Sequence, residues 1–492
     1  MVLAALSGIL YTIAFSFSPL WWISFVALLP LLLSLDRAKT WKAAVVRITL
    51  FSIIFSTGMG YWLFNALVGH YRLTAGTAVL FFCLALMLPV WLIHLTIALF
   101  YRFLNDRSLV FYALLVPGLW VLGDYVKGLI PLLIPWGDIG YALVDWGAYF
   151  QVADLGGIYL VSFLVVMFNA LLVGLIRSRS ETGLPCRWRP ITNRPGITAL
   201  LLVLIISGPL CYGSVRRCLM PAASSAGQKT PAVIVQGNFS PEDRWGGLGF
   251  YQRLKTYVEL SGVLPDSARG GVIVWPETVL NHPEALTGPF FEDLARMPGG
   301  KHLLITGGLK RDRQQQGVYN SVYVLEVGQL QRYDKHILLP YSERAPAVGP
   351  LFRFYNAPDR FIPGTTPVCL STSHGRVGLS VCFEILYPGY VRRSVTQGAE
   401  FLVNVSNDSW FGDSAMPRAH LRAARARAVE TGRWLLRASN SGISAIISPD
   451  GGLTASSDLF RAQRISGSLA PLTGTTAYVQ SEDWLFFFSL MM

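Results

Sequence analysis

The stretch VGLSVCFEI, residues 377–385, sets the character of the second half of this chain. Val377, Leu379 and Val381 alternate with small or polar residues, which is the period of a strand with a buried face. Cys382 stands where this apolar run ends. A cysteine at the end of a buried strand can fill the core, form half of a disulfide or act as a nucleophile. The rest of the sequence has to decide between these roles.

Short β-rich runs recur along the chain from about residue 228 onward. We predict strands within 231–238, 270–277, 302–309, 321–335, 376–384, 399–408 and 441–452. Hairpin turns are predicted at Val327-Gly328 and around Pro449-Asp450-Gly451, where turn-forming residues separate two runs. Helical stretches lie between the strands, most clearly over 417–438. Strands interleaved with helices predict an α/β layered sandwich for this part of the chain.

The composition of the whole chain indicates that another part of it lies in lipid. Of the 492 residues, 52% are hydrophobic and 14% are charged, whereas charged residues make up about a quarter of a typical soluble domain. A chain of this length is expected to form more than one domain. The formal net charge is +12, but many basic residues lie between apolar runs. We therefore expect a membrane, and no nucleic acid, as the partner of this charge.

Apolar runs that are candidates to cross a membrane occupy the first 213 residues. We predict spans at 3–18, 19–35, 48–67, 77–100, 109–124, 157–176 and 197–213. A helix needs about 20 residues to cross a bilayer, so the first, second and fifth runs are short. No lysine or arginine precedes the first run, so a cleavable signal peptide is not expected. We predict a transmembrane helical domain over 1–213 and a sandwich domain over 228–478.

The charges of the connecting loops predict the orientation of the transmembrane domain. The loops after the second, fourth and sixth runs are basic, and the first of these carries Arg37, Lys39, Lys42 and Arg47. Basic loops remain on the cytoplasmic side of a membrane. The seventh run then delivers the sandwich domain to the outer side, which in a bacterium is the periplasmic side of the inner membrane.

Three features of the apolar parts need a separate interpretation. The segment 125–156 is apolar and aromatic but is interrupted by Pro, Gly and Asp, which fits a re-entrant or interfacial piece. Asn169 lies inside a span, where a polar residue either serves function or forms an interhelical hydrogen bond, and we favour the hydrogen bond. The segment 483–492 is too short to span, so we predict a short C-terminal anchor, which is either a clipped final helix or an interfacial piece.

The usual catalytic motifs are missing from the sequence. It contains no GxSxG elbow, no Walker A loop, no GxGxxG after a strand and no HExxH. The histidines show no ligand spacing and the cysteines form no CxxC pair, so we predict neither a metal site nor a cofactor. What remains is a set of polar residues at predicted strand ends: Glu277, Lys335 and Cys382. Taken singly, each is more often structural, as a helix cap, a solvated charge and a core residue respectively.

The other cysteine of the predicted sandwich, Cys369, offers a disulfide as an alternative role for Cys382. If His374-Gly375 forms a two-residue turn, Cys369 faces Ser380 and Cys382 is a diagonal neighbour at about 7–8 Å. The Cα atoms of a disulfide are usually closer than about 7 Å, so the bridge is disfavoured. A register slip of one residue on each strand would bring the two cysteines opposite each other.

The motifs around the three polar residues together resemble a known superfamily. VWPE (274–277), YDKHILLPYSE (333–343), LSVCFE (379–384) and NVSNDSWFGDS (404–414) are similar to motifs of the carbon–nitrogen hydrolase, or nitrilase, superfamily. The apolar first half, with ADLGGIYLVSF (153–163) and QGNFSPEDRW (236–245), resembles its membrane-bound branch, the apolipoprotein N-acyltransferases. The resemblance covers nearly the whole chain. It implies a transmembrane helical bundle followed by a periplasmic αββα sandwich of the nitrilase type.

The resemblance also implies roles for individual residues. Cys382 would be the nucleophile, Glu277 the general base and Lys335 the residue that stabilises the tetrahedral intermediate. A thiol with a pKa near about 8.5 is mostly protonated at neutral pH, so it needs a base or a nearby cation before it can attack. Glu343 matches a second glutamate of the family, and Trp245 matches a tryptophan near the substrate entrance.

Two of the family positions leave questions open in this sequence. Phe383 and Glu384 follow the cysteine where the family usually has Tyr-Glu, so Phe383 lacks the hydroxyl group that a tyrosine would carry. Glu343 can raise the pKa of Glu277 as a like charge. Alternatively, Glu343 forms an ion pair with Arg344 or another basic residue.

The activity implied by the resemblance is the last step of bacterial lipoprotein maturation. An acyl chain would pass from a phospholipid through a thioester acyl-enzyme to the α-amino group of the diacylglyceryl-cysteine of an apolipoprotein, with ping-pong kinetics. We expect a monomer without a cofactor. One alternative is a membrane-tethered amidase or nitrilase-like hydrolase that uses the same three residues with water as acceptor. Another is a transporter or scaffold with an inactive domain, which the complete set of Glu277, Lys335 and Cys382 argues against.

Overall fold

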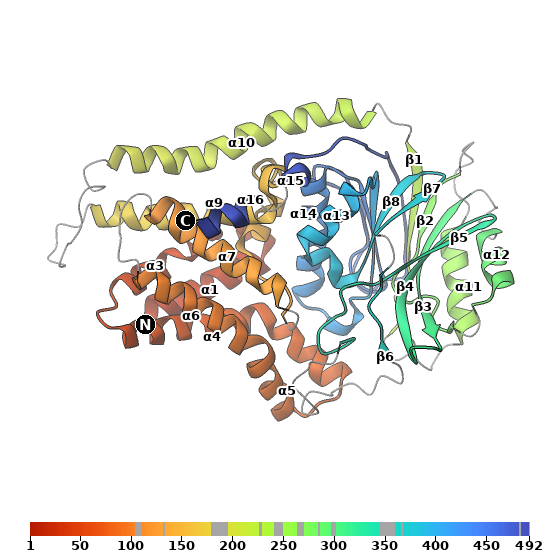
Figure 1. Cartoon of the computed structure of the whole chain (residues 1–492), viewed down its shortest axis with the longest axis horizontal. Coiled ribbons are helices and arrows are strands. Elements are labelled where there is room, and N and C mark those ends of the chain that lie inside the picture. Colours follow the sequence, from red (N-terminus) through yellow and green to blue (C-terminus); the bar gives the residue numbers. More distant parts are fainter. Residues whose placement is uncertain are drawn as a thin grey trace. The chain divides into compact units, whose positions relative to one another are not determined.

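The chain forms two compact units. The computed structural model describes residues 1–103, 111–130, 133–178, 195–225, 229–240, 249–262, 270–283, 286–296, 302–344, 360–365, 368–481 and 484–491. Unit 1 comprises Met1–Phe64, Thr74–Cys218 and Ser481–Met492. Unit 2 comprises Asn65–Leu73 and Leu219–Gln480. Figure 1 shows that unit 1 consists of helices, whereas unit 2 contains all the labelled strands.

The predicted apolar runs of the first half are helical over most of their length. Among the described residues, five helical stretches are long and apolar enough to cross a membrane: Ser18–Asp36, Trp41–His70, Ala75–Phe103, Ala153–Ile176 and Gly196–Met220. α1 (Val2–Ser16) is apolar but shorter. Phe111–Leu129 carries Asp124 and Lys127 and is not among the five. The seven spans expected from the sequence therefore exceed the five stretches that satisfy length and composition.

The five stretches combine α-helical, 3₁₀ and π-helical segments. The elements of these stretches and of Phe111–Leu129 are η1 (Ser18–Ile23), α2 (Ser24–Ala27), α3 (Leu29–Asp36), α4 (Trp41–Asn65), η2 (Ala66–His70), α5 (Ala75–Phe81), η3 (Phe82–Met87), α6 (Leu88–Phe103), η4 (Phe111–Leu115), α7 (Val116–Leu129), α9 (Ala153–Ser178) and α10 (Pro195–Ser225).

Asn169 on α9 forms hydrogen bonds with backbone groups at the break between α2 and α3. Its Oδ1 accepts from the backbone N–H groups of Leu28 and Leu29 at 2.9 and 3.0 Å. Its Nδ2 donates to Ser24 O at 2.9 Å and to Val165 O at 2.8 Å. The predicted interhelical hydrogen bond is therefore confirmed, and the side chain satisfies backbone groups where the helix is interrupted.

The segment after α7 is irregular and buried, and it contains two short helices, η5 (Ile139–Asp145) and α8 (Gly147–Phe150). Lys127 Nζ lies 2.7 Å from both Asp124 Oδ1 and Asp138 Oδ1 and donates to Trp136 O at 3.1 Å. One buried lysine thus ties α7 to the segment that follows it. The predicted re-entrant or interfacial piece at 125–156 begins inside α7, and its depth in a membrane stays a prediction.

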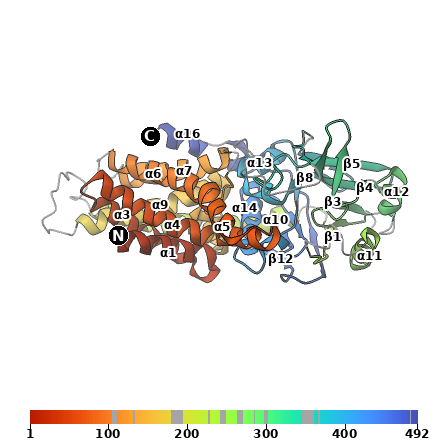
Figure 2. The same cartoon turned by 90° about the horizontal axis from the view of Figure 1, so that it is seen from below.

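The C-terminal helix α16 (Trp484–Met491) packs against α7 and α9 within unit 1 (Figure 2). The ring of Phe486 stacks on Tyr125 with the ring centroids 4.3 Å apart. Trp484 Nε1 donates to Leu155 O at 3.0 Å. The described part of the predicted C-terminal segment is therefore a helix of eight residues that contacts helices of the first half.

Unit 2 is a sandwich of two sheets. The first sheet has the order β13-β1-β2-β3-β4-β5 with β6 paired to β4, and the second has the order β12-β11-β10-β9-β8-β7. The strands of the first sheet are β1 (Thr230–Gln236), β2 (Val272–Val274), β3 (Leu303–Asp312), β4 (Gly317–Glu326), β5 (Gln329–Asp334), β6 (Arg360–Phe361) and β13 (Gln463–Leu469). Those of the second are β7 (Cys369–Thr372), β8 (Gly375–Val381), β9 (Phe401–Ser406), β10 (Leu435–Ser439), β11 (Ala445–Ile447) and β12 (Leu453–Ser456).

Helices cover the outer faces of both sheets (Figure 1). They are α11 (Phe250–Ser261) and α12 (Gly288–Arg296) on the first sheet, and α13 (Pro388–Thr396) and α14 (Met416–Thr431) on the second, with the short α15 (Ala477–Gln480) beside α13 and α14. The predicted αββα sandwich is confirmed.

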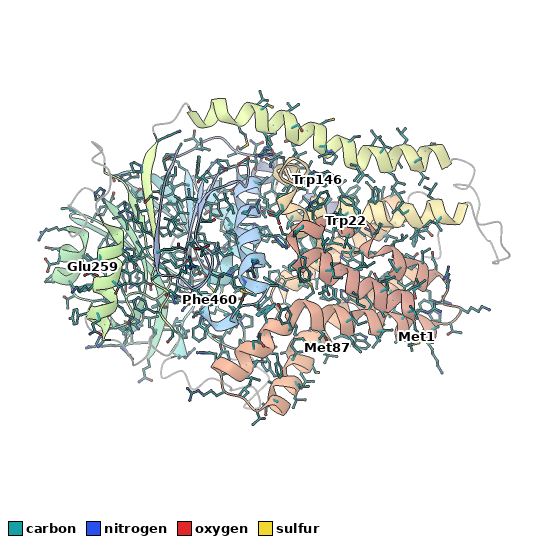
Figure 3. The ribbon with its side chains drawn as sticks, turned by 180° about the vertical axis from the view of Figure 1, so that it is seen from behind. Met1, Trp22, Met87, Trp146, Glu259 and Phe460 are labelled. Atoms are coloured by element: carbon teal, nitrogen blue, oxygen red, sulfur yellow. The ribbon has the colours of Figure 1, made fainter. Side chains whose placement is uncertain are left out.

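Burial explains the sequence patterns of this sandwich. β1, β2 and β3 are parallel neighbours covered on both faces, so they appear as continuous apolar runs such as 272–274. Helix α11 has one apolar face, with Leu254 and Tyr257 in the core below the sheet. Its Glu259 points away from the sheet (Figure 3). Such one-sided patterns are typical of helices that cover a core.

One predicted helix is too long. The pattern over 417–438 was expected to be helical throughout, but α14 ends at Thr431, where Gly432 takes a left-handed conformation with φ +63°. Residues 435–439 form β10, which pairs in parallel with β9. A short apolar run fits a helix or a strand equally well, and here pairing with β9 makes residues 435–439 a strand.

The two predicted hairpins are confirmed. β4 and β5 pair antiparallel around Val327-Gly328, and β11 and β12 pair antiparallel around Asp450-Gly451.

The turn between β7 and β8 lies one residue earlier than the His374-Gly375 turn considered in the sequence. Thr372 pairs with Gly375, so Ser373-His374 form the turn, and Cys369 lies opposite Gly378. Gly378 on β8 is four residues before Cys382, a separation of about 13 Å along extended chain. Both cysteines are free. A disulfide between them is therefore excluded, as the sequence had already disfavoured.

Candidate active site

Cys382 is the first residue after β8 and begins the short 3₁₀ helix η9 (Cys382–Leu386). Its φ is +52°, a left-handed conformation that costs a non-glycine residue about 1–3 kcal/mol. Its carbonyl oxygen lies within hydrogen-bond distance of His420 Nε2, at 3.2 Å, and of Asn404 Nδ2, at 3.4 Å. The strand therefore turns sharply at the cysteine, and two side chains from other elements hold that turn.

The environment of the Cys382 thiol keeps its proton in place. The residue is 6% exposed. Burial and the carboxylate of Glu277 raise the pKa of this thiol, whereas the ammonium group of Lys335 lowers it. The net pKa lies above the ordinary value, so a base has to take the proton before the sulfur can attack.

Glu277 follows β2 through Trp275-Pro276 and is 8% exposed. Its Oε1 accepts from Asn320 Nδ2 at 2.7 Å and lies 4.0 Å from Lys335 Nζ. Strand β3 approaches Glu277 so closely that a Cβ atom on Gly307 would lie 2.5 Å from the Cα of Glu277. Glycine at 307 therefore allows the backbone contact that positions the carboxylate.

Lys335 is the first residue after β5 and is 1% exposed. Its Nζ lies 2.7 Å from Glu343 Oε2. Burial lowers the pKa of Lys335, but the carboxylates of Glu343 and Glu277 outweigh burial, so the pKa lies above its ordinary value. Glu343 also accepts from Asn320 Nδ2 at 2.9 Å and from the N–H of Leu339 at 2.8 Å. The structure thus brings a buried, charged lysine between two carboxylates.

Of the two interpretations of Glu343, the structure supports the ion pair, and its partner is Lys335. Burial raises the pKa of Glu343, but the charge of Lys335 and the hydrogen bond from the Leu339 N–H lower it more. The net pKa lies below the ordinary value. Glu343 therefore stays ionised and neutralises the charge of Lys335.

This ion pair is expected to make the stability of the protein depend on pH. Because the pKa of Glu343 is lower in the folded chain, its ionised form stabilises the fold above the unfolded pKa of about 4.3. That contribution is lost as the pH falls through the lower, folded pKa. We expect Glu343→Gln to lower the midpoint of thermal unfolding in detergent micelles at neutral pH. Its difference from wild type should shrink as the pH falls below about 4.

The control for this experiment is Glu292→Gln, because Glu292 lies on α12 with 65% of its side chain exposed. We expect that variant to follow the wild type at every pH, since an exposed ion pair contributes about 0–1 kcal/mol. A Glu343→Gln difference that stays constant down to acid pH would contradict the prediction.

Glu384 links the segment after Lys335 to the turn at Cys382. It is fully buried. Its carboxylate accepts four hydrogen bonds, from the backbone N–H groups of His336 (2.7 Å), Ile337 (3.0 Å) and Val381 (2.7 Å) and from the hydroxyl group of Tyr333 (2.6 Å). Burial raises the pKa of Glu384 to about 7, against the opposing effect of these donors. Because one carboxylate bonds both segments, it sets the spacing between the lysine and the cysteine.

Phe383 is 3% exposed and packs among rings. Its ring stacks on that of His420, with centroids 5.3 Å apart and an interplanar angle of 24°, and meets Phe411 edge-on at 5.9 Å. An unsubstituted phenyl ring suits these apolar surroundings. Trp245 lies outside the described residues, so its place at a substrate entrance stays a prediction.

Sequence reasoning missed the asparagines and the histidine that support the site. Asn320 in β4 bridges Glu277 and Glu343, and Asn404 in β9 bonds the carbonyl of Cys382 together with His420. The signal for the two asparagines was present, because each is a polar residue inside a strand that is otherwise buried. Buried polar side chains require partners, which makes such positions candidates for a site.

A small polar cleft opens beside Glu277. It is lined by Phe239, Arg253, Tyr257, Asn281, Asn407 and Asn440 together with Glu277. Arg253 Nη2 donates to Asn281 Oδ1 at 2.9 Å.

Comparisons with known protein families match the first and the second part of the chain separately. Residues 7–171 match the family described as "Apolipoprotein N-acyltransferase N-terminal domain", and residues 234–476 match "Carbon-nitrogen hydrolase". The apolipoprotein N-acyltransferase of Haemophilus ducreyi is 26% identical over 504 residues, covering 99% of this chain and 94% of the relative. That of Pseudomonas putida is 30% identical over 383 residues, covering 76% of this chain and 71% of the relative.

Solved structures of the nitrilase superfamily match about half of the chain. A Saccharomyces cerevisiae member of the superfamily is 19% identical, covers 52% of this chain and 93% of its own, and gives a TM-score of 0.39. A carbon-nitrogen hydrolase from Helicobacter pylori is 19% identical, covers 49% of this chain and 89% of its own, and gives a TM-score of 0.38.

Proposed function

This chain belongs to the apolipoprotein N-acyltransferase family, and we propose that it transfers an acyl chain from a phospholipid to the N-terminal diacylglyceryl-cysteine of apolipoproteins. The observation that carries the proposal is the buried set of Glu277, Lys335 and Cys382, in a chain whose described residues include five helical stretches long and apolar enough to cross a membrane. The membrane helices would hold the enzyme in the bilayer that contains its two lipid substrates.

In the first half-reaction, Glu277 takes the proton of the Cys382 thiol as the sulfur attacks the ester carbonyl of the phospholipid. The carbonyl oxygen becomes an oxyanion, which the ammonium group of Lys335 stabilises together with the backbone N–H of Phe383. That N–H stands in the first turn of η9, where backbone N–H groups have no acceptor within the turn. The C–O bond then breaks, and the leaving lysophospholipid oxygen takes the proton back from Glu277. The product is a thioester on Cys382.

In the second half-reaction, the α-amino group of the acceptor attacks the thioester. Glu277 takes a proton from this amine, the oxyanion forms at the same donors, and the C–S bond breaks. The sulfur leaves as a thiolate and regains the proton from Glu277, so the enzyme returns to its starting state with an amide as product. Two substrates and one covalent intermediate give ping-pong kinetics.

Glu343 has an electrostatic role in this scheme. Its ion pair with Lys335 at 2.7 Å keeps the lysine charged and fixed before the oxyanion forms. A preorganised donor stabilises a developing charge better than one that must first move into place. Trp245, which lies outside the described residues, is proposed at the substrate entrance.

The position in the cell is also part of the proposal. The basic loops after the second, fourth and sixth apolar runs favour an orientation in the bacterial inner membrane with the catalytic unit on the periplasmic side. A monomer is sufficient, because Glu277, Lys335 and Cys382 all come from one chain.

The experiment that tests the activity compares two acceptor peptides. Purified protein is mixed with phospholipid radiolabelled in its acyl chains and a diacylglyceryl-cysteine peptide with a free α-amino group. We expect label to move to the peptide as an amide that neutral hydroxylamine does not cleave. The same peptide with an acetylated α-amino group should receive no label. Free fatty acid as the main product with both peptides would instead support the membrane-tethered hydrolase, which uses water as acceptor.

A further inference from the structure

The carbonyl oxygen of Cys382 is held by side chains that the catalytic scheme does not use. His420 on α14 places its Nε2 at 3.2 Å from this oxygen, and Asn404 on β9 places its Nδ2 at 3.4 Å. The Asn404 amide also donates to Ser380 Oγ at 3.0 Å. His420 and Asn404 are both fully buried, so these contacts do not compete with solvent. His420 is the closer of the two donors.

Holding this carbonyl oxygen also holds the N–H of Phe383. The two groups belong to one planar trans peptide unit, in which the C=O and the next N–H point in opposite directions. Cys382 has a φ of +52°, which a non-glycine residue keeps only when its surroundings hold it there. Hydrogen bonds to the Cys382 carbonyl oxygen therefore fix the direction in which the Phe383 N–H points.

A buried guanidinium group supports both donors. Arg437 on β10 is fully buried, and its Nη1 donates to Asn404 Oδ1. Its Nη2 lies 2.8 Å from Asp408 Oδ2 and 3.0 Å from His420 Nδ1. Asp408 neutralises the charge of Arg437. The same arginine thus orients the amide of Asn404 and the ring of His420.

Two contacts of His420, one at each ring nitrogen, favour a proton on Nε2. Burial and the charge of Arg437 lower the pKa of His420 against the opposing charge of Asp408, so the ring is neutral and has one N–H. A proton on Nε2 lets the ring donate to the Cys382 carbonyl and leaves Nδ1 to accept from Arg437. Asp408 Oδ1, which lies 3.0 Å from Nδ1, then accepts from Ser406 Oγ at 2.9 Å.

The ring of Phe383 completes the arrangement by stacking on His420. Phe383, whose N–H is oriented, therefore packs directly on His420, the side chain that orients it. The stack covers one face of the imidazole, and Arg437 and Asp408 contact its Nδ1 edge, so the ring has little freedom to rotate away from the Cys382 carbonyl.

We propose that His420 and Asn404 are positioning residues that hold the Cys382–Phe383 peptide so that the Phe383 N–H faces the oxyanion. The proposal rests on the proposed acyl transfer, and it assigns Arg437 and Asp408 the task of orienting the two donors. Because the oxyanion exists only in the reaction and not in the bound substrate, loss of this alignment lowers kcat and leaves KM unchanged.

A matched pair of variants at His420 tests the proposal. In His420→Gln the side-chain amide nitrogen reaches about as far as Nε2 and can still donate to the Cys382 carbonyl. In His420→Asn the amide reaches only about as far as Nδ1, so it can bond Asp408 or Arg437 but not the carbonyl. The measurement is the single-turnover rate of acyl-enzyme formation from labelled phospholipid, with kcat and KM of the full reaction.

We expect His420→Asn to lower the acylation rate and kcat by roughly 10²-fold, the usual effect of losing an oxyanion donor, with KM within about twofold of wild type. His420→Gln should recover most of that loss. Equal rates in the two variants, or a rise in KM with kcat unchanged, would overturn the proposal. A wild-type protein that forms no acyl-enzyme would instead contradict the proposed function, so the two failures are distinguishable.

A second variant keeps the test decisive if both changes at His420 unfold the protein. Asn404→Asp has the same size and retains the oxygen that accepts from Arg437, but it lacks the N–H that faces the Cys382 carbonyl. We expect its kcat to fall by about tenfold with KM unchanged, less than for His420→Asn because its hydrogen bond is longer. A wild-type kcat in Asn404→Asp would remove Asn404 from the positioning role.

Discussion

Cys382→Ala is expected to abolish the acyl-enzyme. Wild-type protein incubated with radiolabelled phospholipid and no acceptor should retain label that neutral hydroxylamine releases, as a thioester does. The variant should retain none, and its transfer activity should fall by about 10⁴-fold or more, because the nucleophile of a covalent mechanism has no substitute. The measurement is the label on the protein band after gel electrophoresis, with and without hydroxylamine.

The matched control is Cys369→Ala. Cys369 is also a buried free cysteine of the second sheet, but it lies opposite Gly378 and not near the end of β8 where Glu277 and Lys335 act. It should label like the wild type. Label on the Cys382→Ala protein that hydroxylamine releases would show that another residue is the nucleophile and would refute the mechanism.

The Lys335→Met variant is expected to be less stable and less active than the wild type. The change removes the cation that lies 2.7 Å from Glu343 and 4.0 Å from Glu277, so two buried carboxylates lose their common partner. Breaking a buried pair in this way costs about 3–5 kcal/mol, which should lower the midpoint of thermal unfolding by on the order of 10 °C. Loss of the oxyanion partner should lower kcat by roughly 10²–10³-fold.

The double variant Lys335→Met/Glu343→Gln separates these two effects. Removing the uncompensated charge of Glu343 should restore part of the thermal stability, since a neutral amide is less costly to bury than a carboxylate. It should not restore kcat, because no cation faces the oxyanion. A double variant that regains activity along with stability would show that Lys335 acts only by stabilising the fold.

Lys310→Met controls for the substitution itself. Lys310 lies on β3 and its side chain is exposed, so the variant should keep the wild-type kcat and unfold within about 0.5 kcal/mol of wild type.

Local patterns predicted most of the architecture. The alternation over 377–381 and the continuous apolar run over 272–274 indicated strands. Residues next to each other on a strand point to opposite faces, so the pattern of apolar residues shows which faces are buried. The turn at Val327-Gly328 was equally local, since Gly328 adopts a φ of +77°, which glycine tolerates better than other residues. Where local patterns were ambiguous, as over 435–439, pairing with β9 overrode the helical interpretation.

A helical first half, an α/β sandwich and three candidate residues at strand ends could be predicted from the residues alone, because burial periods and motifs are properties of contiguous residues. The partners of these residues, in contrast, depend on how distant segments pack. Glu343 has Arg344 beside it in the chain but pairs with Lys335 in the fold. The Cys382 carbonyl is bonded by residues of β9 and α14. The strength of a buried ion pair or hydrogen bond depends on distance and exclusion of water, and both are set only when distant segments pack together.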